Sequence, residues 1–548
     1  MTTLLTDNLP LLAGAPNGIR KLRELILELA VRGKLVPQDP SDEPASELLK
    51  RIADERARLV AEGKIKKQKP LPDIREEEKP FELPGGWGWR RFGEIFLLEY
   101  GNNLPADKRS NTGEYPVYGS NGVIGTHHTS FVNSPCIVVG RKGSAGALNL
   151  CVSRGCCVTD VAYYCIPPSD FSIDYVFKLF HTLGLDSLGK GIKPGLSRNE
   201  VYELVLALPP LAEQHRIVTK VDELMALCDR LEAQQADAES VHARLVQALL
   251  DSLTQATNAD DFAASWRRLA EHFHTLFSTE SSIDALKQAV LQLAVMGKLV
   301  PQDPNDEPAS IWLERIEAAR LAIAGQKGIQ KKPIAALEGE KVALPDSWSW
   351  VTLSQIIMQM DSGWSPACEP TSSPSPDIWG VLKTTAVQAL EYRQEENKIL
   401  PQHLEPRPEA EVKPGDILFT RAGPTNRVGI SCLVEKTRPR LMISDKIIRF
   451  HPVEVGAYGR YISLCLNTGE TARYLEKSKS GMAASQVNIS QEKLKLAPIP
   501  LPPLPEQLRI VERIDQLMTL CDQLKARLTQ ARQFNEQLAS VLVEQAVA

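Results

Sequence analysis

The stretch from Gly184 to Lys190 has the spacing of a phosphate-binding loop, with Gly184, Gly189 and Lys190 in the required places. In such a loop, backbone N–H groups and the lysine hold the phosphates of a nucleotide, and a following Ser or Thr binds Mg²⁺. Here Gly191 occupies the Ser or Thr position, and no clear buried strand precedes the loop. The sequence therefore argues against a nucleotide-hydrolysing site at this position.

A second group with catalytic residue types is acidic. Asp73 is followed by Glu77, Glu78 and Lys79, a set that resembles the carboxylates of a metal-dependent nuclease. The group lies in a charged stretch that we interpret as a linker, where nothing would hold metal ligands rigidly. We therefore expect no nuclease site here.

Other reactive groups also lack their usual pattern. The chain has no Asn-Pro-Pro-aromatic or Asp-Pro-Pro-Tyr stretch, which an amino-methyltransferase pocket would need. His127 and His128, and the cysteines from Cys151 to Cys165, do not have the spacing of a zinc knuckle or a helical metal site. We expect a binding protein with no catalytic site, no metal site and no cofactor of its own.

The chain contains two long internal repeats. The residues from Gly33 to Ser46 return from Gly297 to Ser310, with only Ser41 replaced by Asn305. A second motif, Leu-Pro-Pro-Leu-x-Glu-Gln-x-x-Ile-Val, begins at Leu208 and again at Leu501. The sequences between the repeats do not match. This pattern indicates a tandem duplication in which two frames are kept and two middles differ.

The offsets between the copies show where the two halves differ in length. The offset is 261 from Trp87 to Trp348 and 293 from Pro209 to Pro502, so the second middle is longer by 32 residues. The frames around the middles barely change length. Frame and middle were therefore free to vary separately.

Each copy opens with an apolar pattern at the three- and four-residue spacing of one helix face. Gly33 and Gly297 follow as helix C-caps, and a second short helix is expected from Pro44 and from Pro308. The helix-face residues are Ile19, Leu22, Leu25, Ile26 and Leu29 in the first copy, and Ile283, Leu286, Ala289, Val290 and Leu293 in the second.

The middles have the character of mixed, mainly β domains. Short runs of β-branched and aromatic residues, such as those at 136–139 and 416–420, alternate with Gly- and Pro-rich stretches. The lysine-containing stretches at 64–69 and 327–332 read as linkers, with contact to a DNA backbone or a partner as the alternative.

After each Leu-Pro-Pro-Leu motif, apolar residues fall at alternating spacings of four and three, which predicts a heptad seam. Gln235 interrupts the seam and is interpreted as a weak point. For His242 and Asn535, a register-setting polar layer and fraying near the helix ends remain equal alternatives. The predicted coiled-coil interface comprises Ile217, Val221, Leu224, Cys228, Leu231, Leu245 and Leu249, and Ile510, Ile514, Leu517, Cys521, Leu524, Leu528 and Leu538.

Composition sets the class of protein. The 548 residues carry a net charge of −5, which gives no overall footprint of a nucleic-acid binder. The middles are near neutral, with 11 Lys and Arg against 10 Asp and Glu from Arg90 to Ala207. The scattered cysteines fit a reducing compartment, and neither a membrane span nor the basic start of a signal peptide is found. We expect a cytoplasmic protein.

These features together resemble the specificity subunit of type I restriction-modification enzymes. The most specific marks are the two Leu-Pro-Pro-Leu motifs and the Leu-Pro-x-x-Trp-x-Trp motif, which begins at Leu83 and again at Leu344. A further mark is Tyr-Pro-Val-Tyr-Gly-Ser-Asn-Gly, which begins at Tyr115. The resemblance covers nearly the whole chain.

The resemblance implies an α+β fold in which two mixed, mainly β target recognition domains are joined by an antiparallel coiled coil, as a pseudo-two-fold tandem repeat. The expected domains are an N-terminal helical region (1–82), recognition domain 1 (83–210), a coiled-coil helix (211–255), a linker (256–282), a central helical region (283–343), recognition domain 2 (344–503) and a second coiled-coil helix (504–548).

The resemblance also implies the function. The chain would be the non-catalytic DNA-recognition subunit that reads a bipartite asymmetric target in double-stranded DNA. It would dock two methyltransferase subunits and the restriction subunits, which would carry S-adenosylmethionine, ATP and Mg²⁺. A coiled helix about 35 residues long would be a rod of roughly 50 Å, so coil length would set the spacer between half-sites. The alternative is a coiled-coil adaptor whose β domains bind protein.

For base reading, we consider Gly-flanked polar and cationic loops, where little bulk keeps a side chain from a groove edge. Ordinary surface turns are an equally weighted interpretation at each position. The candidates are Tyr118, Ser120, Asn121, Arg141, Lys142, Lys190 and Lys193 in the first domain, and Arg421, Thr425, Asn426, Arg427, Lys477, Lys479, Ser480 and Gln486 in the second.

Overall fold

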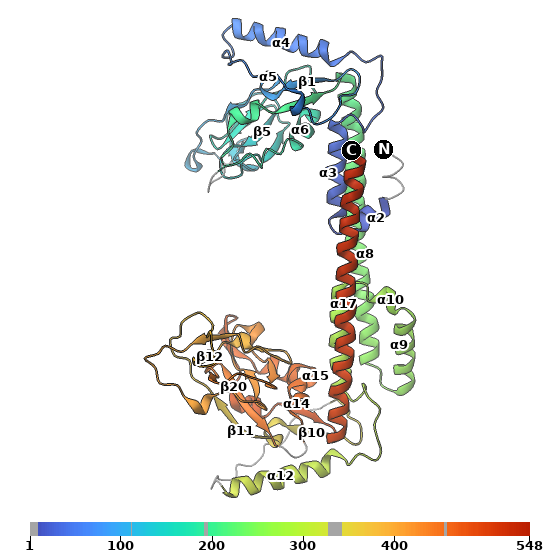
Figure 1. The fold of residues 1–548 in the computed structure, drawn as a ribbon, viewed down its shortest axis with the longest axis vertical. Helices are drawn as coiled ribbons and strands as arrows, with labels where there is room; N and C mark the ends of the chain where they lie inside the picture. The colour runs from blue at the N-terminus through green and yellow to red at the C-terminus, as the bar shows by residue number, and fades with distance from the viewer. Residues whose placement is uncertain (1–8, 111, 191–194, 327–341, 454–456, 548) are drawn as a thin grey trace. The chain divides into compact units, whose positions relative to one another are not determined.

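The computed structural model describes residues 9–110, 112–190, 195–326, 342–453 and 457–547. They belong to two compact units, one made of residues 1–239 and 530–548, the other of residues 240–529. Each unit contains a β domain, a group of frame helices, and part of each of two long helices, α8 (Leu211–Thr254) and α17 (Leu504–Val547) (Figure 1). Within the described part of the chain, no helix is both long and apolar enough to span a bilayer.

The frame helices of the first unit bear out the predicted periodicity. Helix α3 (Gly18–Val31) buries Ile19, Leu22, Leu25, Ile26 and Leu29. It is followed by Gly33, whose φ of 68° lies in the left-handed region, and the N–H of Lys34 bonds the carbonyl of Leu29 across 2.9 Å. The flanking helices are α2 (Leu9–Gly14) and α4 (Ala45–Ala61). Helix α4 is longer than the short helix expected after Pro44.

The first β domain begins and ends with the antiparallel pair β1 (Gly88–Arg91) and β9 (Val205–Leu208). One sheet has the order β2-β8-β5-β6 and the other β4-β3-β7. The strands are β2 (Glu99–Tyr100), β3 (Tyr115–Tyr118), β4 (Val123–His127), β5 (Cys136–Gly140), β6 (Leu148–Cys151), β7 (Cys157–Val158) and β8 (Ala162–Cys165), with helices α5 (Phe92–Ile95), α6 (Ile173–His181) and α7 (Arg198–Tyr202).

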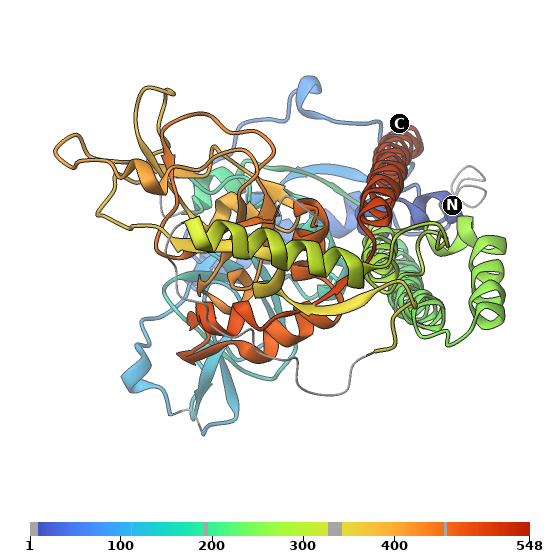
Figure 2. The ribbon, with the colours of Figure 1, turned by 90° about the horizontal axis from the view of Figure 1, so that it is seen from below.

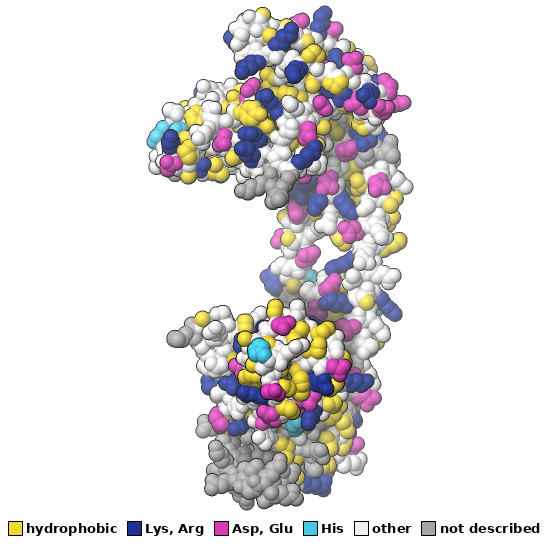
Figure 3. Space-filling model, turned by 60° about the vertical axis from the view of Figure 1, so that its left-hand side comes forward, with side chains coloured by type: hydrophobic (Ala, Val, Ile, Leu, Met, Phe, Trp, Pro, Cys, Tyr) yellow, Lys and Arg dark blue, Asp and Glu magenta, His cyan; other side chains and the backbone are white. Residues whose placement is uncertain are grey.

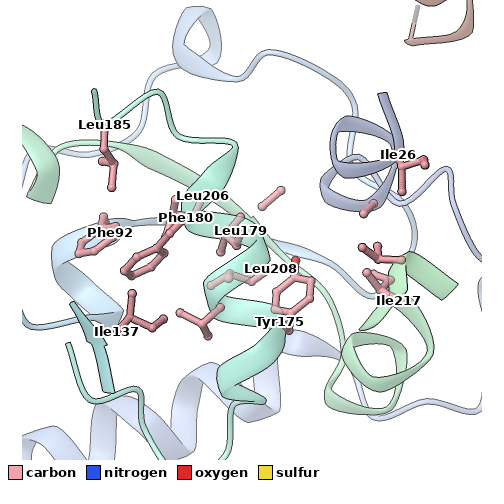
Figure 4. Close-up of a cluster of buried hydrophobic side chains, with 14 of the residues drawn as sticks. Ile26, Phe92, Ile137, Tyr175, Leu179, Phe180, Leu185, Leu206, Leu208 and Ile217 are labelled. Carbon is pink, nitrogen blue, oxygen red and sulfur yellow. The ribbon is translucent and has the colours of Figure 1, made fainter. Parts of the chain in front are cut away.

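Helix α6 connects the β domain of this unit to its frame. Its residues Tyr175, Leu179 and Phe180 lie among Phe92 and Ile137 on one side and extend toward Ile26 and Ile217 on the other (Figure 4). All of these side chains belong to one buried cluster. The frame and the β domain of the first unit therefore share a continuous core, which fixes the orientation of that β domain on its frame.

The second unit repeats this plan. Its β domain begins and ends with β10 (Ser349–Thr352) paired to β23 (Pro498–Leu501), and its sheets have the orders β11-β20-β16-β18 and β15-β12-β19. The strands are β11 (Ile357–Ser362), β12 (Gly380–Leu382), β15 (Asn397–Ile399), β16 (Ile417–Thr420), β18 (Ser431–Leu433), β19 (Leu441–Met442) and β20 (Ile447–Pro452). Two domains of unlike sequence thus adopt the same strand order, which agrees with the expected pseudo-repeat.

The second domain has further small sheets, and in the described part of the first domain only the single bridges of Lys142 and Lys190 to Gly195 correspond to the larger of them. The second domain adds a two-stranded sheet, β13 (Val387–Gln388) with β14 (Glu391–Tyr392), and a three-stranded sheet of order β17-β22-β21. The strands of the latter are β17 (Ala422–Gly423), β21 (Ser480–Ala483) and β22 (Gln486–Asn488). The helices are α13 (Leu353–Ile356), α14 (Gly459–Asn467), α15 (Gly469–Ser478) and α16 (Gln491–Lys495), and α12 (Ala309–Gln326) lies across one end of the domain (Figure 2).

One segment differs from its prediction. Residues 256–282 were expected to be a linker, but they contain helices α9 (Ala259–Glu271) and α10 (Phe273–Leu276). Leu269, Leu276 and Phe277 are buried there against α11 (Glu280–Val295) and the end of α8. The prediction was wrong because the apolar positions are few, although Asn258 caps α9 by accepting the N–H of Asp261 across 2.8 Å.

Among the predicted seam positions, the fully buried ones lie in the first halves of the long helices. Ile217, Val221, Leu224 and Cys228 are buried in α8, and Leu231 is partly buried. Farther along, Leu245 is 50% exposed, whereas Val246 is only 4% exposed and Leu250 2%. The placement of Leu245 in the seam was therefore wrong, while Leu249 is partly buried.

The reason is helix geometry. Val246 follows Cys228 by 18 residues, which is five turns of a straight helix with 3.6 residues per turn, whereas the heptad pattern assumes 3.5. Helix α17 repeats the shift, because Ala539 follows Cys521 by the same 18 residues and is fully buried. In α17, Ile510, Ile514 and Cys521 are buried, and Leu517, Leu524, Leu528 and Leu538 are partly buried.

The polar seam positions have separate roles. Gln235 donates a hydrogen bond to the carbonyl of Ala13 across 2.7 Å and so satisfies the end of α2. His242 bonds the carbonyl of Thr275 across 3.1 Å, and Asn535 is exposed. Neither His242 nor Asn535 lies in a buried polar layer.

The repeated motifs meet in space and form a junction in each unit. In the first, Trp87 donates to Glu213 across 2.9 Å, and Gln38 donates to the same carboxylate across 2.8 Å and to the carbonyl of Gly33 across 3.1 Å. A Cβ on Gly33 would lie 2.5 Å from Cγ of Pro84. Residues of the three repeated motifs of the sequence therefore pack together in one junction.

The second junction repeats most of these bonds, and there the indole N–H of Trp348 also lies 3.2 Å from Oε1 of Gln302. Trp348 donates to Glu506 across 3.0 Å, Gln302 donates to the carbonyl of Gly297 across 3.1 Å, and a Cβ on Gly297 would lie 2.5 Å from Cγ of Pro345. A salt bridge completes each junction, from Arg216 to Asp42 and from Arg509 to Asp306, both at 2.6 Å. In each unit, residues of the repeated motifs bond or contact one another, which explains why these residues are repeated together.

Candidate nucleic-acid interface

In the first β domain, the fold brings the three candidate loops together. The β3–β4 turn is held by the N–H of Gly119 on the carbonyl of Gly122 across 2.9 Å. A Cβ on Gly143 would lie 3.9 Å from Oγ of Ser120, so the second loop borders this turn. The third loop joins them through Lys142 and Lys190, each of which forms a backbone bridge to Gly195.

The individual side chains differ in availability. Asn121 and Lys142 are exposed, and Ser120 and Arg141 are half-buried. Lys190 is exposed but forms an ion pair with Glu200 at 2.5 Å. Lys193 lies outside the described residues. Ser120, Asn121, Arg141 and Lys142 are therefore the first-domain candidates that can still take a ligand.

Tyr118 is a correction. Its side chain is 8% exposed and belongs to the cluster that contains Cys136, Cys151 and Cys156. Burial, together with a hydrogen bond to Cys151, raises the pKa of its phenol. It was a candidate because Gly119, Ser120 and Asn121 follow it, but as the last residue of β3 its side chain faces the core and cannot reach a base.

Two residues of the first domain were missed by the sequence reasoning. The guanidinium carbon of Arg141 lies 4.8 Å from the centroid of the Tyr100 ring, and that of Arg198 lies 4.9 Å from it. Tyr100 is 46% exposed. No motif marks Tyr100 or Arg198, because almost a hundred residues separate them and only folding brings them together.

In the second domain, the sheet β17-β22-β21 joins the two candidate segments. Thr425 donates from both its backbone N–H and its Oγ1 to the carbonyl of Ala484, each across 2.9 Å. Lys479 donates to the carbonyl of Thr425 across 2.8 Å. The segments at 421–427 and 477–486, distant in sequence, thus form one surface. Asn426, Lys477, Ser480 and Gln486 are exposed on it, and Arg421 is half-buried.

Three second-domain candidates support the loop itself. Arg427 donates to the carbonyls of Thr384 and Val387, each across 2.7 Å, and to Gln388 across 3.1 Å. Its pKa is lowered because its guanidinium is buried. Thr425 donates to the carbonyl of Ala484, and Lys479 donates to the carbonyl of Thr425. As base-contacting residues, Arg427, Thr425 and Lys479 are corrections, since each already donates to backbone carbonyls of a neighbouring segment.

Arg141 and Arg421 occupy equivalent positions in the two domains. The N–H of Arg141 bonds the carbonyl of Val161 across 2.9 Å, and that of Arg421 bonds Lys446 across 2.8 Å. Their own carbonyls accept the N–H of Leu196 and of Ile489, both across 2.8 Å. Each arginine directly follows the central strand of its sheet, β5 or β16. Two unrelated sequences therefore present an arginine at the same point of the fold.

The residues first considered for catalysis have structural roles. The Gly184 loop follows helix α6 and not a strand. Glu78 pairs with the buried Arg91 across 2.8 Å, and this bond lowers the pKa of the Glu78 carboxyl. The acidic stretch therefore anchors β1. Lys66, Lys67 and Lys69 are exposed, and residues 327–332 lie outside the described residues.

One group of thiols could approach a metal. Among the described residues, the sulfur atoms of Cys136, Cys151 and Cys156 lie within 4.8 Å of one another and are fully buried. A closed zinc site has four ligands, and this group supplies three. Hydrogen bonds to the neighbouring thiols, together with burial, raise the pKa of Cys136, whereas the same thiol contacts lower the pKa of Cys151.

Surface charge is mixed. Figure 3 shows Lys and Arg side chains interspersed with Asp, Glu and hydrophobic side chains over the face that it draws. Any anion site on these domains must therefore be local, as the near-neutral composition of the middles predicts.

Comparison with known proteins gives consistent matches. The model of the type I restriction modification DNA specificity domain matches residues 84–239 and again residues 386–531. The EcoEI specificity subunit of Escherichia coli is 48% identical, over 97% of this chain and 94% of its own length. The EcoAI specificity subunit of Escherichia coli is 34% identical over the same shares. A solved chain, described under complex assembly and conformational transition of the type I R-M system, is 19% identical and covers 85% of this chain and 99% of its own length, with a TM-score of 0.47.

Proposed function

The chain belongs to the type I restriction modification DNA specificity family, and from this premise we propose that its two β domains read two unlike half-sites of one DNA target. As a specificity subunit with two recognition domains, it binds DNA in a type I system and has no catalytic activity of its own. The adaptor alternative, with β domains that bind protein, is not favoured.

The observation that carries the proposal is the shared plan with unlike loops. Both domains have the same strand order and an arginine at the same point after the central strand. The loops around that point differ, because the first domain offers the β3–β4 turn with Asn121 and the second offers the β17-β22-β21 sheet with Asn426 and Gln486. Two domains with the same strand order but different polar side chains in their loops can bind two different base sequences.

The partners are DNA and the other subunits of the restriction-modification complex. We propose two modification subunits, one for each unit of the chain. Val241 in the second unit and Phe534 in the first stand at equivalent positions of α8 and α17, and they are 55% and 65% exposed. Exposed apolar patches, rather than single side chains, mark association surfaces. On each helix a second exposed apolar side chain lies on the same face, Leu245 four residues after Val241 and Val541 seven residues after Phe534. Two equivalent surfaces support two copies of one partner.

The stoichiometry can be tested by light scattering of the purified complex. Val241→Asp and Phe534→Asp are each expected to reduce the number of bound modification subunits from two to one, and the double variant to remove both. Val152→Asp is the control, because Val152 is 72% exposed on the first β domain. Two modification subunits bound to the double variant would contradict the proposed surface.

The chemistry of the complex belongs to the partners in this proposal. Modification subunits would bring S-adenosylmethionine for adenine methylation, and restriction subunits would bring ATP and Mg²⁺. The sequence supports this division, since it lacks a methyltransferase motif and a complete phosphate-binding loop.

A mobility-shift experiment tests the proposed function. The chain, co-expressed with its modification subunits, is mixed with genomic fragments and an excess of competitor DNA. We expect a small set of fragments to be retained that share a two-part motif. Equal retention of all fragments would contradict sequence-specific DNA binding and would favour the adaptor alternative.

A further inference from the structure

The first β domain carries two arginines that share one aromatic ring and no acidic partner. Arg141 and Arg198 both lie within 5 Å of the Tyr100 ring centroid. Among the described residues, neither guanidinium forms an ion pair, and each bonds one backbone carbonyl, Asp160 for Arg141 and Leu98 for Arg198. The nearby Glu200 is already paired with Lys190.

This arrangement places two guanidinium groups against the same aromatic ring. Contact with a ring face attracts each guanidinium, but it does not neutralise the repulsion between the two. The Tyr100 ring packs against the Tyr163 ring, with ring centroids 5.0 Å apart and an interplanar angle of 60°. Each arginine donates only some of its N–H groups to a backbone carbonyl, so its other N–H groups can still bind a ligand.

We propose that Arg141, Arg198 and Tyr100 bind one phosphate of the DNA backbone beside the half-site that the first domain reads. This inference rests on the proposed function and adds the position and chemistry of a contact. A phosphodiester supplies the missing negative charge and accepts hydrogen bonds from two guanidinium groups at once. Such a contact sets the register of the domain on the duplex and leaves base choice to Asn121 and Lys142 nearby.

The second domain shows that the pair is a local device. Its Arg421 matches Arg141, but Ser362 stands where the first domain has Tyr100, because Ser362 pairs with Ile448 in β20 as Tyr100 pairs with Tyr163 in β8. Gln491 follows the helix-capping Ser490 as Arg198 follows Ser197. The second domain therefore has one arginine at this point where the first has two.

The test measures how DNA affinity depends on salt for the complex of this chain with its modification subunits. Fluorescence anisotropy in a potassium chloride series is recorded with two short duplexes. One carries the two-part motif found in the mobility-shift experiment, and the other carries the same bases in scrambled order. We expect the double variant Arg141→Gln, Arg198→Gln to reduce the slope of log affinity against log salt by about 0.9 on both duplexes, because one phosphate contact is lost, and each single variant to reduce it by part of that amount.

Controls separate this contact from folding and from loss of charge. Arg75→Gln removes an exposed positive charge that is already paired with Glu77, and we expect an unchanged slope. Arg198→Lys keeps the charge, so the slope is retained while the affinity falls. Tyr100→Ala lowers the affinity for both duplexes because the arginines lose their support. Thermal unfolding confirms that each variant folds.

Two results would overturn the phosphate site. One is an unchanged salt slope for both Gln variants, and the other is a loss confined to the duplex with the motif, which would indicate base reading. Both differ from failure of the proposed function, in which the unmodified complex would not distinguish the two duplexes.

Discussion

Trp87 donates its indole N–H to the buried carboxylate of Glu213 across 2.9 Å, and Trp348 repeats this bond with Glu506 across 3.0 Å. Each bond ties the strand that begins a recognition domain to the long helix that follows the domain. The orientation of each domain on its helix therefore depends on a polar contact inside an apolar junction.

Glu213→Ala is expected to destabilise the first unit by about 1–3 kcal/mol, because it leaves the buried Trp87 N–H and the Gln38 amide without their acceptor. Glu506→Ala should cost less in the second unit, because the Trp348 N–H keeps Oε1 of Gln302 as a second acceptor at 3.2 Å. Urea unfolding measures both. A change within error for both variants would show that the junctions do not hold the domains.

The same carboxyls predict a pH dependence. Burial raises the pKa of Glu213 and of Glu506 above the ordinary value of 4.5, against the opposing effect of their hydrogen bonds. The folded state then holds these protons more tightly than the unfolded chain does. The free energy of unfolding therefore falls as pH rises from about 4.5 through the raised pKa. The double variant Glu213→Gln, Glu506→Gln should lack this fall in urea unfolding at a series of pH values. An unaltered profile would assign the effect elsewhere.

Gly33→Ala tests the glycine at the repeated helix end. The residue has a φ of 68°, and an added Cβ would lie 2.5 Å from Cγ of Pro84. Gly63→Ala is a matched control, since Gly63 has a φ of 71° but no atom within 4 Å of an added Cβ. Both variants share the backbone strain of about 1 kcal/mol, and only the first adds the clash. Equal melting temperatures for the two variants would mean that the glycine is needed for its backbone alone.

Adjacent residues of α8 test the shift of the seam. Val246→Asp should destabilise the second unit by several kcal/mol, because it buries an unpaired charge, whereas Leu245→Asp should change stability little. Circular dichroism melts compare the two. A larger loss for Leu245→Asp would restore the heptad register predicted from the sequence.

Local patterns of the sequence predicted much of the frame. The buried face of α3, its end at Gly33 and the first half of each long helix follow from spacing and from backbone preferences that neighbouring residues set. The repeats predicted two equivalent halves but not their reason, because the bond from Trp87 to Glu213 joins residues 126 positions apart. Helices α9 and α10 were missed, since most of their burial comes from other helices.

The candidate site was harder to predict. The segments around Arg421 and Gln486 were both chosen from the sequence, and the structure brings them together. Tyr118 was misplaced because the side of a strand that faces the core depends on strands that arrive later in the chain. Tyr100 and Arg198 escaped notice because neither has a motif and their contact exists only in the fold.

The most direct test of the central claim is single-molecule methylome sequencing of one host with and without this chain, with its modification subunits present in both. The account predicts an adenine-methylated motif in two unlike parts around a nonspecific spacer, present only with the chain. Exchange of the loop at 421–427 should alter one part of the motif and leave the other unchanged. A methylation pattern that does not depend on the chain would contradict its role as the reader of the DNA target.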